Sequence, residues 1–185
     1  MATVLVPLAN GFEEIEALTV VDVLRRGSQK VVTASIENGL EVVGSHGIEV
    51  KADALLPDVV DEAYDAIVLP GGGGGTERLR RCTALLHRLQ RQASEKRLLC
   101  AICAAPAVLV DAGVLDREVQ VTCYPTCQME LDRPWTPAPV VVDGNVITGQ
   151  APGTALLFAL VVLKTLAGEA AAEGVARRMV TDVLE

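Results

Sequence analysis

Short apolar runs alternate with longer helical segments along this chain, and this alternation limits the fold more than any other feature. The runs at Thr3–Leu8 and Ala66–Leu69, and the run that leads to Cys103, have the length of buried strands. Between them, Glu13–Arg26 and Glu77–Ala93 have the residue pattern of helices. Apolar strands that alternate with helices predict an α/β fold, a mostly parallel sheet covered by helices on both faces.

The other elements follow the same plan, and a chain of 185 residues without a linker or repeat predicts one domain over residues 1–185. They are a strand at Lys30–Ile36, a hairpin of Glu41–Val43 and Ile48–Ala52, a strand at Val119–Thr122, a hairpin of Val140–Val142 and Asn145–Thr148, and helices at Thr154–Ala167 and Glu169–Leu184.

Composition limits the kinds of binding partner and the cellular compartment that we expect for this chain. A net charge of −8 disfavours binding to nucleic acid or to an anionic membrane surface. The longest apolar run, Ala155–Leu163, is too short to span a bilayer. The N-terminus lacks the charged region of a signal peptide. Five cysteines, an odd number, are simplest to interpret as free thiols in a reducing compartment, so we expect a cytoplasmic protein.

Cys103 lies where the apolar run Arg97–Ile102 meets a helix-compatible segment that begins Ala104-Ala105-Pro106. A nucleophile between a strand and a helix sits on a tight turn that pushes its side chain into a crevice. The amide groups that open the helix then face the thiol and stabilise a thiolate, or an oxyanion beside it. We therefore expect Cys103 to be reactive and to be the most acidic of the five thiols.

Three segments converge on one edge of the predicted sheet. Gly11–Glu16, Gly71–Gly75 and Cys103 each follow a predicted strand, and ligands of such sheets bind outside the carboxyl ends of the strands. The glycine run lacks the Lys-Ser/Thr pair of a phosphate loop, so we expect no nucleotide site. Amides near Gly72 are instead candidates to complete an oxyanion hole with the amide after Cys103.

The cysteines also allow two other interpretations. Cys103 could be an ordinary core residue, a common fate of cysteine, although its place between strand and helix favours reactivity. The spacings of Cys100, Cys103, Cys123 and Cys127 suggest a four-cysteine zinc site, but apolar residues rather than a knuckle loop surround the first pair. We therefore expect no metal and no cofactor.

The acids after the first strand have a simple explanation and a functional one. Glu13, Glu14 and Glu16 lie at a predicted helix start, where carboxylates complement the helix dipole. A carboxyl that faces a thiol competes with it for charge, so the pKa of the acid rises, that of the thiol stays low, and the acid can move a proton. His46 lies in a predicted hairpin turn, where it is either a simple turn residue or a residue that reaches a ligand. Tyr124 follows the end of a predicted strand, so we expect it to line a pocket.

Four motifs resemble those of the ThiJ/PfpI superfamily, in its DJ-one, parkinsonism-associated branch. They are Gly11–Glu16 (GFEEIE), Asp65–Gly72 (DAIVLPGG), Ala101–Pro106 (AICAAP) and Ala151–Thr154 (APGT). Their order and spacing extend the resemblance over nearly the whole chain. It implies a flavodoxin-like three-layer α/β/α sandwich that assembles as a homodimer.

The resemblance also implies roles for single residues. Cys103 matches the nucleophile, Glu16 the partnering carboxyl, and the amides of Gly72 and Ala104 the oxyanion donors. The chemistry that follows is a thiolate that meets a small electrophile.

Further pocket positions are implied for Gly71 and Pro152, which belong to two of the motifs, and for Tyr124 and His46. At the last two the chain departs from the family. Many relatives carry histidine where Tyr124 stands, which weakens a catalytic triad, and closer relatives carry arginine where His46 stands.

A homodimer would involve the first predicted helix. Ile15, Leu18 and Val21 are apolar positions that one sheet face need not cover entirely, so a two-fold contact could bury them. Arg25 and Arg26 end this helix, and in the family such a pair lies near the site of the partner subunit.

The resemblance implies an enzyme that acts on small reactive aldehydes. The first hypothesis is a glutathione-independent glyoxalase that converts methylglyoxal to lactate, or a deglycase that releases amines or thiols from glyoxal adducts, with Cys103 and Glu16 as its only catalytic residues. The alternative is an oxidative-stress sensor or chaperone that responds to oxidation of Cys103. A cysteine peptidase or amidase ranks last, because no histidine is expected near the thiol.

Overall fold

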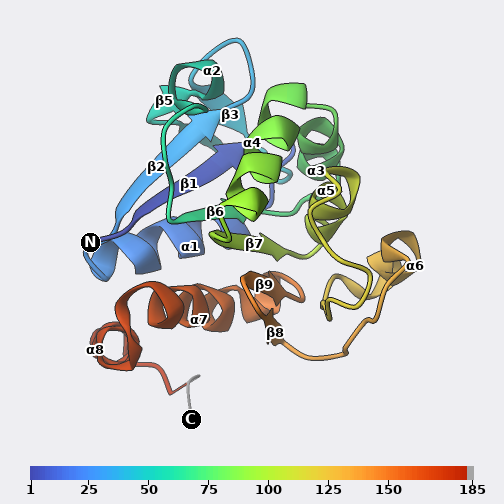
Figure 1. Cartoon of the computed structure of the whole chain (residues 1–185). Helices are drawn as coiled ribbons and strands as arrows, with labels where there is room; N and C mark the ends of the chain where they lie inside the picture. The colour runs from blue at the N-terminus through green and yellow to red at the C-terminus, as the bar shows by residue number, and fades with distance from the viewer. Residues whose placement is uncertain (183–185) are drawn as a thin grey trace.

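The structure, a computed structural model, describes residues 1–182 and is built on a seven-stranded sheet with the strand order β5-β2-β1-β6-β7-β9-β8 (Figure 1). The strands are β1 (Thr3–Leu8), β2 (Lys30–Ser35), β5 (Ala54–Leu55), β6 (Ala66–Leu69), β7 (Leu98–Ile102), β8 (Val140–Asp143) and β9 (Val146–Gly149). Only the β8–β9 pair of this sheet is antiparallel. Counted in chain order, β1, β2, β6, β7 and β9 lie in the order 2-1-3-4-5 of flavodoxin-like sheets.

Helices cover both faces of the sheet, so the predicted three-layer α/β/α sandwich is confirmed (Figure 1). One face carries α1 (Glu14–Arg26), α7 (Ala155–Ala167) and α8 (Glu169–Met179). The other carries α3 (Gly73–Arg80), α4 (Thr83–Ser94) and α5 (Pro106–Asp111). Two short helices, α2 (Leu56–Val59) and α6 (Gln128–Leu131), and two 3-10 turns, Pro125–Cys127 and Pro152–Thr154, complete the layers.

Two apolar cores lie on opposite sides of the sheet because successive strand residues point to opposite faces. In β1, Val4 and Val6 belong to the same core as Phe158 of α7, whereas Leu5 belongs to the opposite core with Leu85 of α4. All five side chains are fully buried or nearly so. The strands are apolar on both faces for this reason, and the sheet is held rigidly between the helices.

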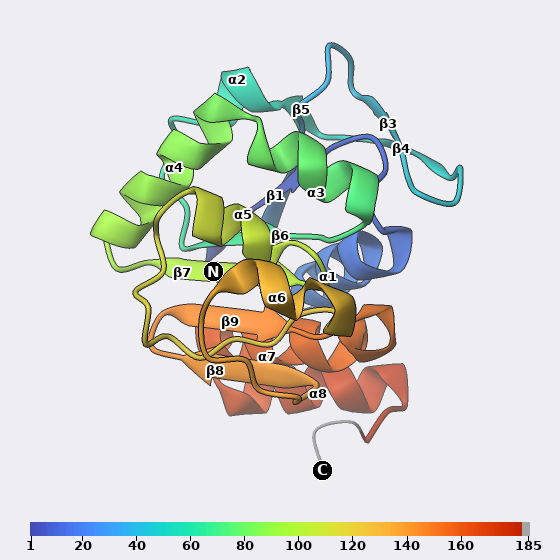
Figure 2. The ribbon, with the colours of Figure 1, turned by 90° about the vertical axis from the view of Figure 1, so that its right-hand side faces the viewer.

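A small hairpin, β3 (Glu41–Val43) and β4 (Glu49–Lys51), forms as predicted and lies apart from the main sheet (Figure 2). The amide of Gly11 donates to Val43 O at 2.7 Å, and the amide of Ser45 donates to Phe12 O at 2.8 Å. The hairpin turn is thereby fixed beside the loop that precedes α1.

Two predicted elements are wrong. The helix expected over Glu77–Ala93 is two helices, α3 and α4, because Cys82 between them adopts an extended backbone. The strand expected over Val119–Thr122 is only an isolated bridge between Val121 and Trp135. Its neighbour Thr122 donates its amide to the side-chain hydroxyl of Thr148 at 2.9 Å, so no ladder continues to the sheet.

Two further boundaries differ from prediction. The last helix, expected over Glu169–Leu184, ends at Met179, and Leu184 lies outside the described residues. The last three glycines of the Gly71–Gly75 run form the first turn of α3 rather than a loop. Over residues 1–182, no helix combines the length and the apolar character needed to cross a membrane.

Candidate active site

The backbone of Cys103 has a conformation that few non-glycine residues adopt. Its φ of 64° lies in the left-handed region, which is strained for an L-residue and persists where the surroundings enforce it. The amide of Cys103 donates to Gly149 O at the end of β9, and its carbonyl accepts from the amide of Tyr124. Cys103 therefore sits on a fixed turn between β7 and α5, as the sequence predicts for a nucleophile.

A buried carboxyl faces this thiol. Glu16 lies in the first turn of α1 and is 0 % exposed. Its Oε2 accepts the amide of Gly71 at 2.7 Å, and its carboxyl hydrogen-bonds with the Cys103 thiol. Its Oε1 has no hydrogen-bond partner within residues 1–182. Burial raises the pKa of Glu16 to about 7, against the lowering effect of Gly71 and Cys103, so this carboxyl can gain or lose a proton near neutral pH.

Gly71 is the spacer between the two side chains. A Cβ at this position would lie 2.6 Å from Glu16 Oε2 and 2.8 Å from Cys103 Cβ. Gly72 has a φ of 88°, and a Cβ there would lie 2.3 Å from Gly11 O. Glycine is needed at both positions because the chain after β6 passes directly against the carboxyl, the thiol and the loop before α1.

Two backbone amides point at the Cys103 sulfur. The amides of Gly72 and Ala104 both hydrogen-bond to it and lower the pKa of the thiol. Burial acts in the opposite direction and dominates, and the Glu16 carboxylate raises the pKa of Cys103 further. The expectation that Cys103 is the most acidic of the five thiols is therefore wrong, because burial, the largest of these effects, raises its pKa whether or not Glu16 is ionised.

The pair holds one negative charge more easily than two. When Glu16 is protonated, its repulsion of the sulfur disappears and the two amides still favour the thiolate. Glu16 and Cys103 thus share one exchangeable proton, and the burial of the sulfur favours the state in which the thiol holds it.

The other expected pocket residues lie at different distances from this pair. Tyr124 is a backbone neighbour of Cys103 through its amide, and its side chain is exposed. Pro152 begins the turn that follows β9, the strand whose last carbonyl holds Cys103. Arg25 and Arg26 lie at the far end of α1, where they pair with Asp53 and Asp22.

His46 reaches the acids at the start of α1 rather than the thiol. Its Nδ1 lies 2.9 Å from Glu14 Oε2 and 3.7 Å from Glu13 Oε2, and the single Ser45 hydroxyl hydrogen lies within hydrogen-bond range of both carboxylates. Burial would raise the pKa of Glu14, but the bonds from His46 and Ser45 outweigh it and lower that pKa to about 2. The hydrogen bond to Glu14 also raises the pKa of His46.

The sequence did not predict this network, because Glu13 and Glu14 were interpreted as acids that complement the dipole of the first helix. The only signal was a histidine in a hairpin turn, and the sequence does not show that this turn lies on α1. Among residues 1–182, Glu13, Glu14 and His46 form the group that could hold a metal ion, because their three ligand atoms lie within 4.8 Å of one another. His46 and Ser45 contact both oxygens of Glu14 and one oxygen of Glu13, so the cluster also stands as an ion-pair network without a metal.

The other metal hypothesis does not fit. Within residues 1–182, Cys100, Cys103, Cys123 and Cys127 do not bring three sulfur atoms within ligand distance of one another. Cys100 is fully buried in the middle of β7, where burial raises the pKa of its thiol. A four-cysteine zinc site is therefore not formed.

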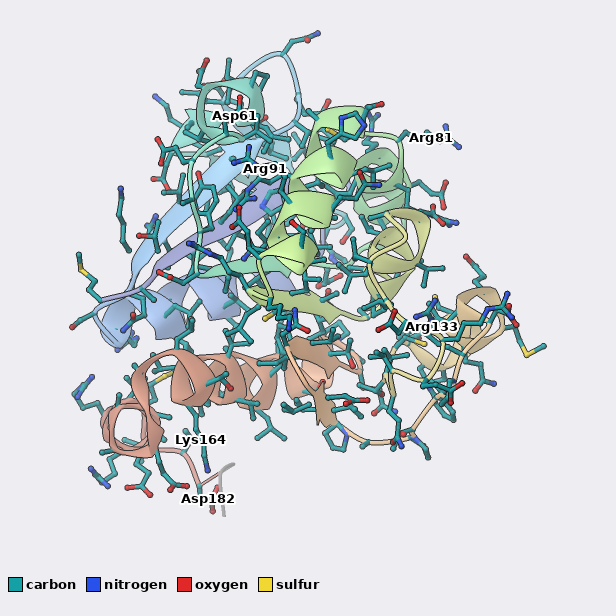
Figure 3. All side chains as sticks on the ribbon, viewed as in Figure 1. Asp61, Arg81, Arg91, Arg133, Lys164 and Asp182 are labelled. Atoms are coloured by element: carbon teal, nitrogen blue, oxygen red, sulfur yellow. The ribbon has the colours of Figure 1, made fainter. Side chains whose placement is uncertain are left out.

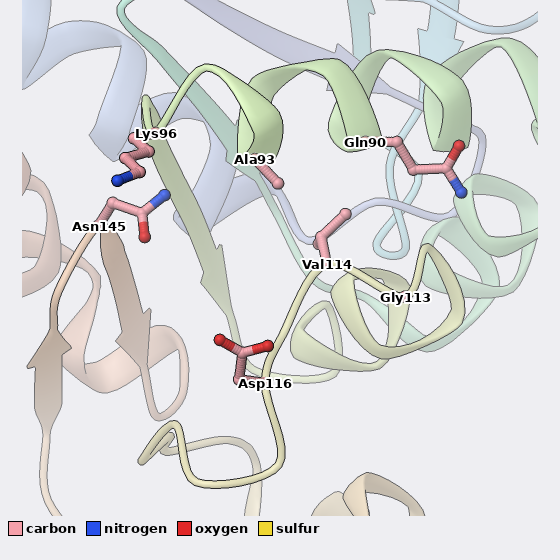
Figure 4. A pocket seen from close by; sticks show the side chains of 7 residues that line it. All are labelled: Gln90, Ala93, Lys96, Gly113, Val114, Asp116 and Asn145. Atoms are coloured by element: carbon pink, nitrogen blue, oxygen red, sulfur yellow. The ribbon is translucent and has the colours of Figure 1, made fainter.

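The cavities of the described structure include one of about 600 Å³ at the opposite end of the sheet (Figure 4). It is lined by Gln90, Ala93, Lys96, Gly113, Val114, Asp116 and Asn145. Lys96 precedes β7 and Asn145 precedes β9, so this cavity opens at the amino ends of the strands, away from Cys103. It shares no residue with the thiol site.

The chain has a flavodoxin-like sandwich fold. Its thiol lies on a strand-to-helix turn and faces a buried carboxyl, which places it among α/β proteins with a cysteine nucleophile at the sheet edge. A family model described as the DJ-1/PfpI family matches residues 2–165. The chain belongs to the DJ-1/PfpI family.

Individual relatives agree with this assignment. "Protein DJ-1 homolog A" of Arabidopsis thaliana is 41% identical over 166 residues, 89% of this chain and 42% of that protein, so the chain spans less than half of this relative. "Glutathione-independent glyoxalase DJR-1.2" of Caenorhabditis elegans is 35% identical over 159 residues, 84% of this chain and 83% of that protein. The solved structure of "Toxoplasma gondii DJ-1, oxidized" has a TM-score of 0.94 and 37% identity, with 98% of this chain and 99% of that chain covered.

Proposed function

We propose that the chain is a Cys103-dependent enzyme that converts small α-oxoaldehydes such as methylglyoxal to hydroxy acids without glutathione, or releases amines from their glyoxal adducts. The observation that carries this proposal is the placement of the fully buried Glu16 carboxyl against Cys103, with only Gly71 between the two side chains. Burial raises the pKa of this carboxyl to about 7. The name of the Caenorhabditis elegans relative, a glutathione-independent glyoxalase, supports the same reaction class.

The proposed reaction with methylglyoxal is an internal redox conversion that consumes one water. The Cys103 thiolate attacks the aldehyde carbon, and Glu16 protonates the new oxygen, which forms a hemithioacetal. The Glu16 carboxylate then takes the proton from that carbon and returns it to the neighbouring carbon, while the hydroxyl proton of the hemithioacetal passes to the former ketone oxygen. The aldehyde carbon is thereby oxidised, the ketone carbon is reduced, and a thioester of lactate results. Water hydrolyses the thioester to lactate and restores the thiol. The amides of Gly72 and Ala104 stabilise oxyanions along this path.

The decisive experiment measures lactate formed from methylglyoxal in the absence of glutathione. We expect Cys103→Ala to abolish turnover and Cys82→Ala, which removes a partly buried thiol between α3 and α4, to retain it. Glu16→Gln should lower turnover by a factor of about 10² to 10⁴, the usual contribution of a general acid–base group, while iodoacetamide still alkylates Cys103. Unchanged lactate production by Cys103→Ala would refute the proposal.

A second candidate function is redox sensing by the same thiol. The amides of Gly72 and Ala104 that hydrogen-bond to the sulfur would also hold the oxygens of a sulfinic acid, and a protonated Glu16 could donate to it. The Toxoplasma gondii protein of similar structure is described as oxidised. If sensing is the main role, mass spectrometry should show that dilute hydrogen peroxide converts Cys103 to the sulfinic acid ahead of the other thiols, and the lactate assay should show no turnover of aldehydes.

We also propose that the chain assembles as a homodimer through α1. Ile15 and Leu18 are 56% and 39% exposed on the outer face of this helix, and Ile48 of the neighbouring hairpin is 54% exposed. Val21, expected on the same face, is only 8% exposed and belongs to the core of its own chain. Light scattering should give twice the 19.5 kDa mass of one chain, and Ile15→Glu should reduce it to a single chain. A wild-type protein that stays monomeric at micromolar concentration would refute the dimer.

A further inference from the structure

Two buried carboxylates at the start of α1 have fewer hydrogen-bond donors than they can accept. Glu13 is 9% exposed and Glu14 is 3% exposed. The Ser45 hydroxyl lies 3.2 Å from Glu13 Oε2 and 3.1 Å from Glu14 Oε2, but it can donate its single hydrogen to only one of them. Glu14 also accepts from His46, whereas Glu13 accepts no other hydrogen bond within residues 1–182. A carboxylate that is nine-tenths buried is thus left with a shared donor, which is costly.

The positive charge beside these carboxylates is also too small to balance them. Within residues 1–182, the His46 ring is the one cationic group that pairs with either carboxylate. Figure 3 shows the labelled cations Arg81, Arg91 and Lys164 at the end of α3, on α4 and on α7, and each of them pairs with an acid elsewhere. The cluster therefore keeps a net negative charge even when the ring is protonated.

The donor atoms of this cluster have the spacing of a tetrahedral metal site. His46 Nδ1 lies 2.9 Å from Glu14 Oε2 and 3.7 Å from Glu13 Oε2. Ser45 Oγ lies 3.0 Å from the same ring nitrogen and at similar distances from both carboxylates. Zinc binds nitrogen and oxygen at about 2.0–2.1 Å, so the ligand atoms of a zinc tetrahedron lie about 3.3 Å apart. The distances within the cluster lie on either side of this value.

The turn that carries Ser45 and His46 is fixed against α1 without a metal. The amide of Ser45 donates to Phe12 O at 2.8 Å. The amide of His46 donates to Glu14 Oε1 at 2.7 Å, which orients this carboxylate and leaves its Oε2 facing the ring. A Cβ on Gly44 would overlap the Glu14 carboxylate, so the turn approaches as closely as glycine allows. Ligands that are held in place before the ion arrives lose little freedom when they bind it.

We propose that Glu13, Glu14 and His46 bind one zinc ion through a carboxylate oxygen each and the ring Nδ1. The Ser45 hydroxyl, or a water that replaces it, takes the fourth position. Zinc accepts carboxylate oxygen together with imidazole nitrogen, whereas magnesium and calcium prefer oxygen alone.

The ion would supply the positive charge that the cluster lacks. Zinc takes the place of the hydrogen on His46 Nδ1, and the neutral ring then carries its one hydrogen on Nε2. The N-terminal end of α1 opposes a cation with about half an elementary charge, which is less than the two full charges of the carboxylates. The site shares no residue with the thiol and carboxyl of the active site, so it stands whether or not that site is catalytic.

The test is calorimetry of zinc binding to the full chain, with nuclear magnetic resonance to locate the ion. We expect one zinc ion per chain. The chain has two histidines, so zinc should shift the ring signals of His46 and leave those of His87, an exposed residue of α4, unchanged. His46→Gln and Glu13→Gln should each weaken zinc binding at least about tenfold, since each removes a ligand. His87→Gln is the matched control and should bind zinc like the wild type.

Thiolates also bind zinc, so the cysteines require their own measurement. Cobalt substitutes for zinc, and we expect it to give the visible absorption of a tetrahedral site without the near-ultraviolet charge-transfer band of a thiolate ligand. Cys103→Ala should keep the affinity of the wild type for zinc. A thiolate band, a His46→Gln variant that binds zinc as tightly as the wild type, or magnesium that binds as tightly as zinc would overturn the proposal. If Glu13→Gln does not fold, the His46 signals and His46→Gln, whose side chain is 69% exposed, still decide the question.

Discussion

Replacing Glu16 with glutamine should change how the stability of the protein depends on pH. Glutamine has the shape of glutamate and its amide oxygen can still accept the Gly71 amide, but it never carries charge. In the native protein burial raises the pKa of Glu16 from its ordinary 4.5 to about 7. Between these values the folded chain holds a proton that the unfolded chain has released. The free energy of unfolding contributed by this group is therefore fully present below pH 4.5 and is lost as pH rises through 7.

The size of this loss follows from the same pKa. One pH unit corresponds to about 1.4 kcal/mol, so a rise from 4.5 to about 7 amounts to roughly 3 kcal/mol. Glu16→Gln should thus gain up to about 3 kcal/mol relative to the wild type between pH 4.5 and pH 8, whatever its stability at pH 4.5.

Urea denaturation from pH 4.5 to 8.5 measures this difference, because titration of all other groups cancels between the two proteins. The same comparison is made in a Cys103→Ala background, in which the thiol that competes for the proton is absent. A stability difference that stays constant with pH in both backgrounds would show that Glu16 titrates normally, and would remove it as a proton carrier near neutral pH.

Three further outcomes follow from the geometry of the site. Gly71→Ala should lower both activity and the unfolding temperature, because its Cβ would lie 2.6 Å from Glu16 Oε2, whereas Gly73→Ala, with nothing within 4 Å, should leave lactate formation unchanged. Tyr124→Phe should cost about tenfold or less in turnover, because a phenol hydroxyl serves as a hydrogen-bond donor rather than a base; a loss as large as that of Cys103→Ala would contradict this. The NMR titration midpoint of His46 should lie above 6.5 and fall in Glu14→Gln, which removes the hydrogen bond that raises its pKa.

The sequence predicted most of the fold because strand and helix signals are local. β1, β3 and β6 begin and end at the predicted residues, since apolar runs closed by glycine or proline set strand ends without help from distant contacts. The break between α3 and α4 was not predictable in this way, because the apolar spacing continues past Cys82. The strand expected around Val121 failed because its neighbour Thr122 bonds to a side chain of β9 instead of a backbone partner.

The sequence predicted the site only to the extent that the topology of a parallel sheet brings distant segments together. Segments that follow parallel strands meet at one sheet edge, and this rule brought Cys103, Gly71 and Glu16 together before any contact was known. It could not show that Gly71 keeps Glu16 and Cys103 at hydrogen-bond range, nor that burial raises the pKa of both. Those effects depend on the packing of α1 against the chain after β6, and pKa values are properties of that packing.

The location of the single charge connects the two proposed functions of this site. Attack on an aldehyde needs the charge on the Cys103 sulfur and the proton on Glu16, and the next step needs the carboxylate, so turnover requires the proton to move in every cycle. Oxidation needs only the thiolate state, and a sulfinic acid held by Gly72 and Ala104 would keep Glu16 protonated afterwards. A pKa of about 7 at Glu16 leaves both protonation states populated near neutral pH, which favours a group that cycles over one that only holds a proton. The same carboxyl would therefore serve turnover first, and oxidation of Cys103 would end it by removing the nucleophile.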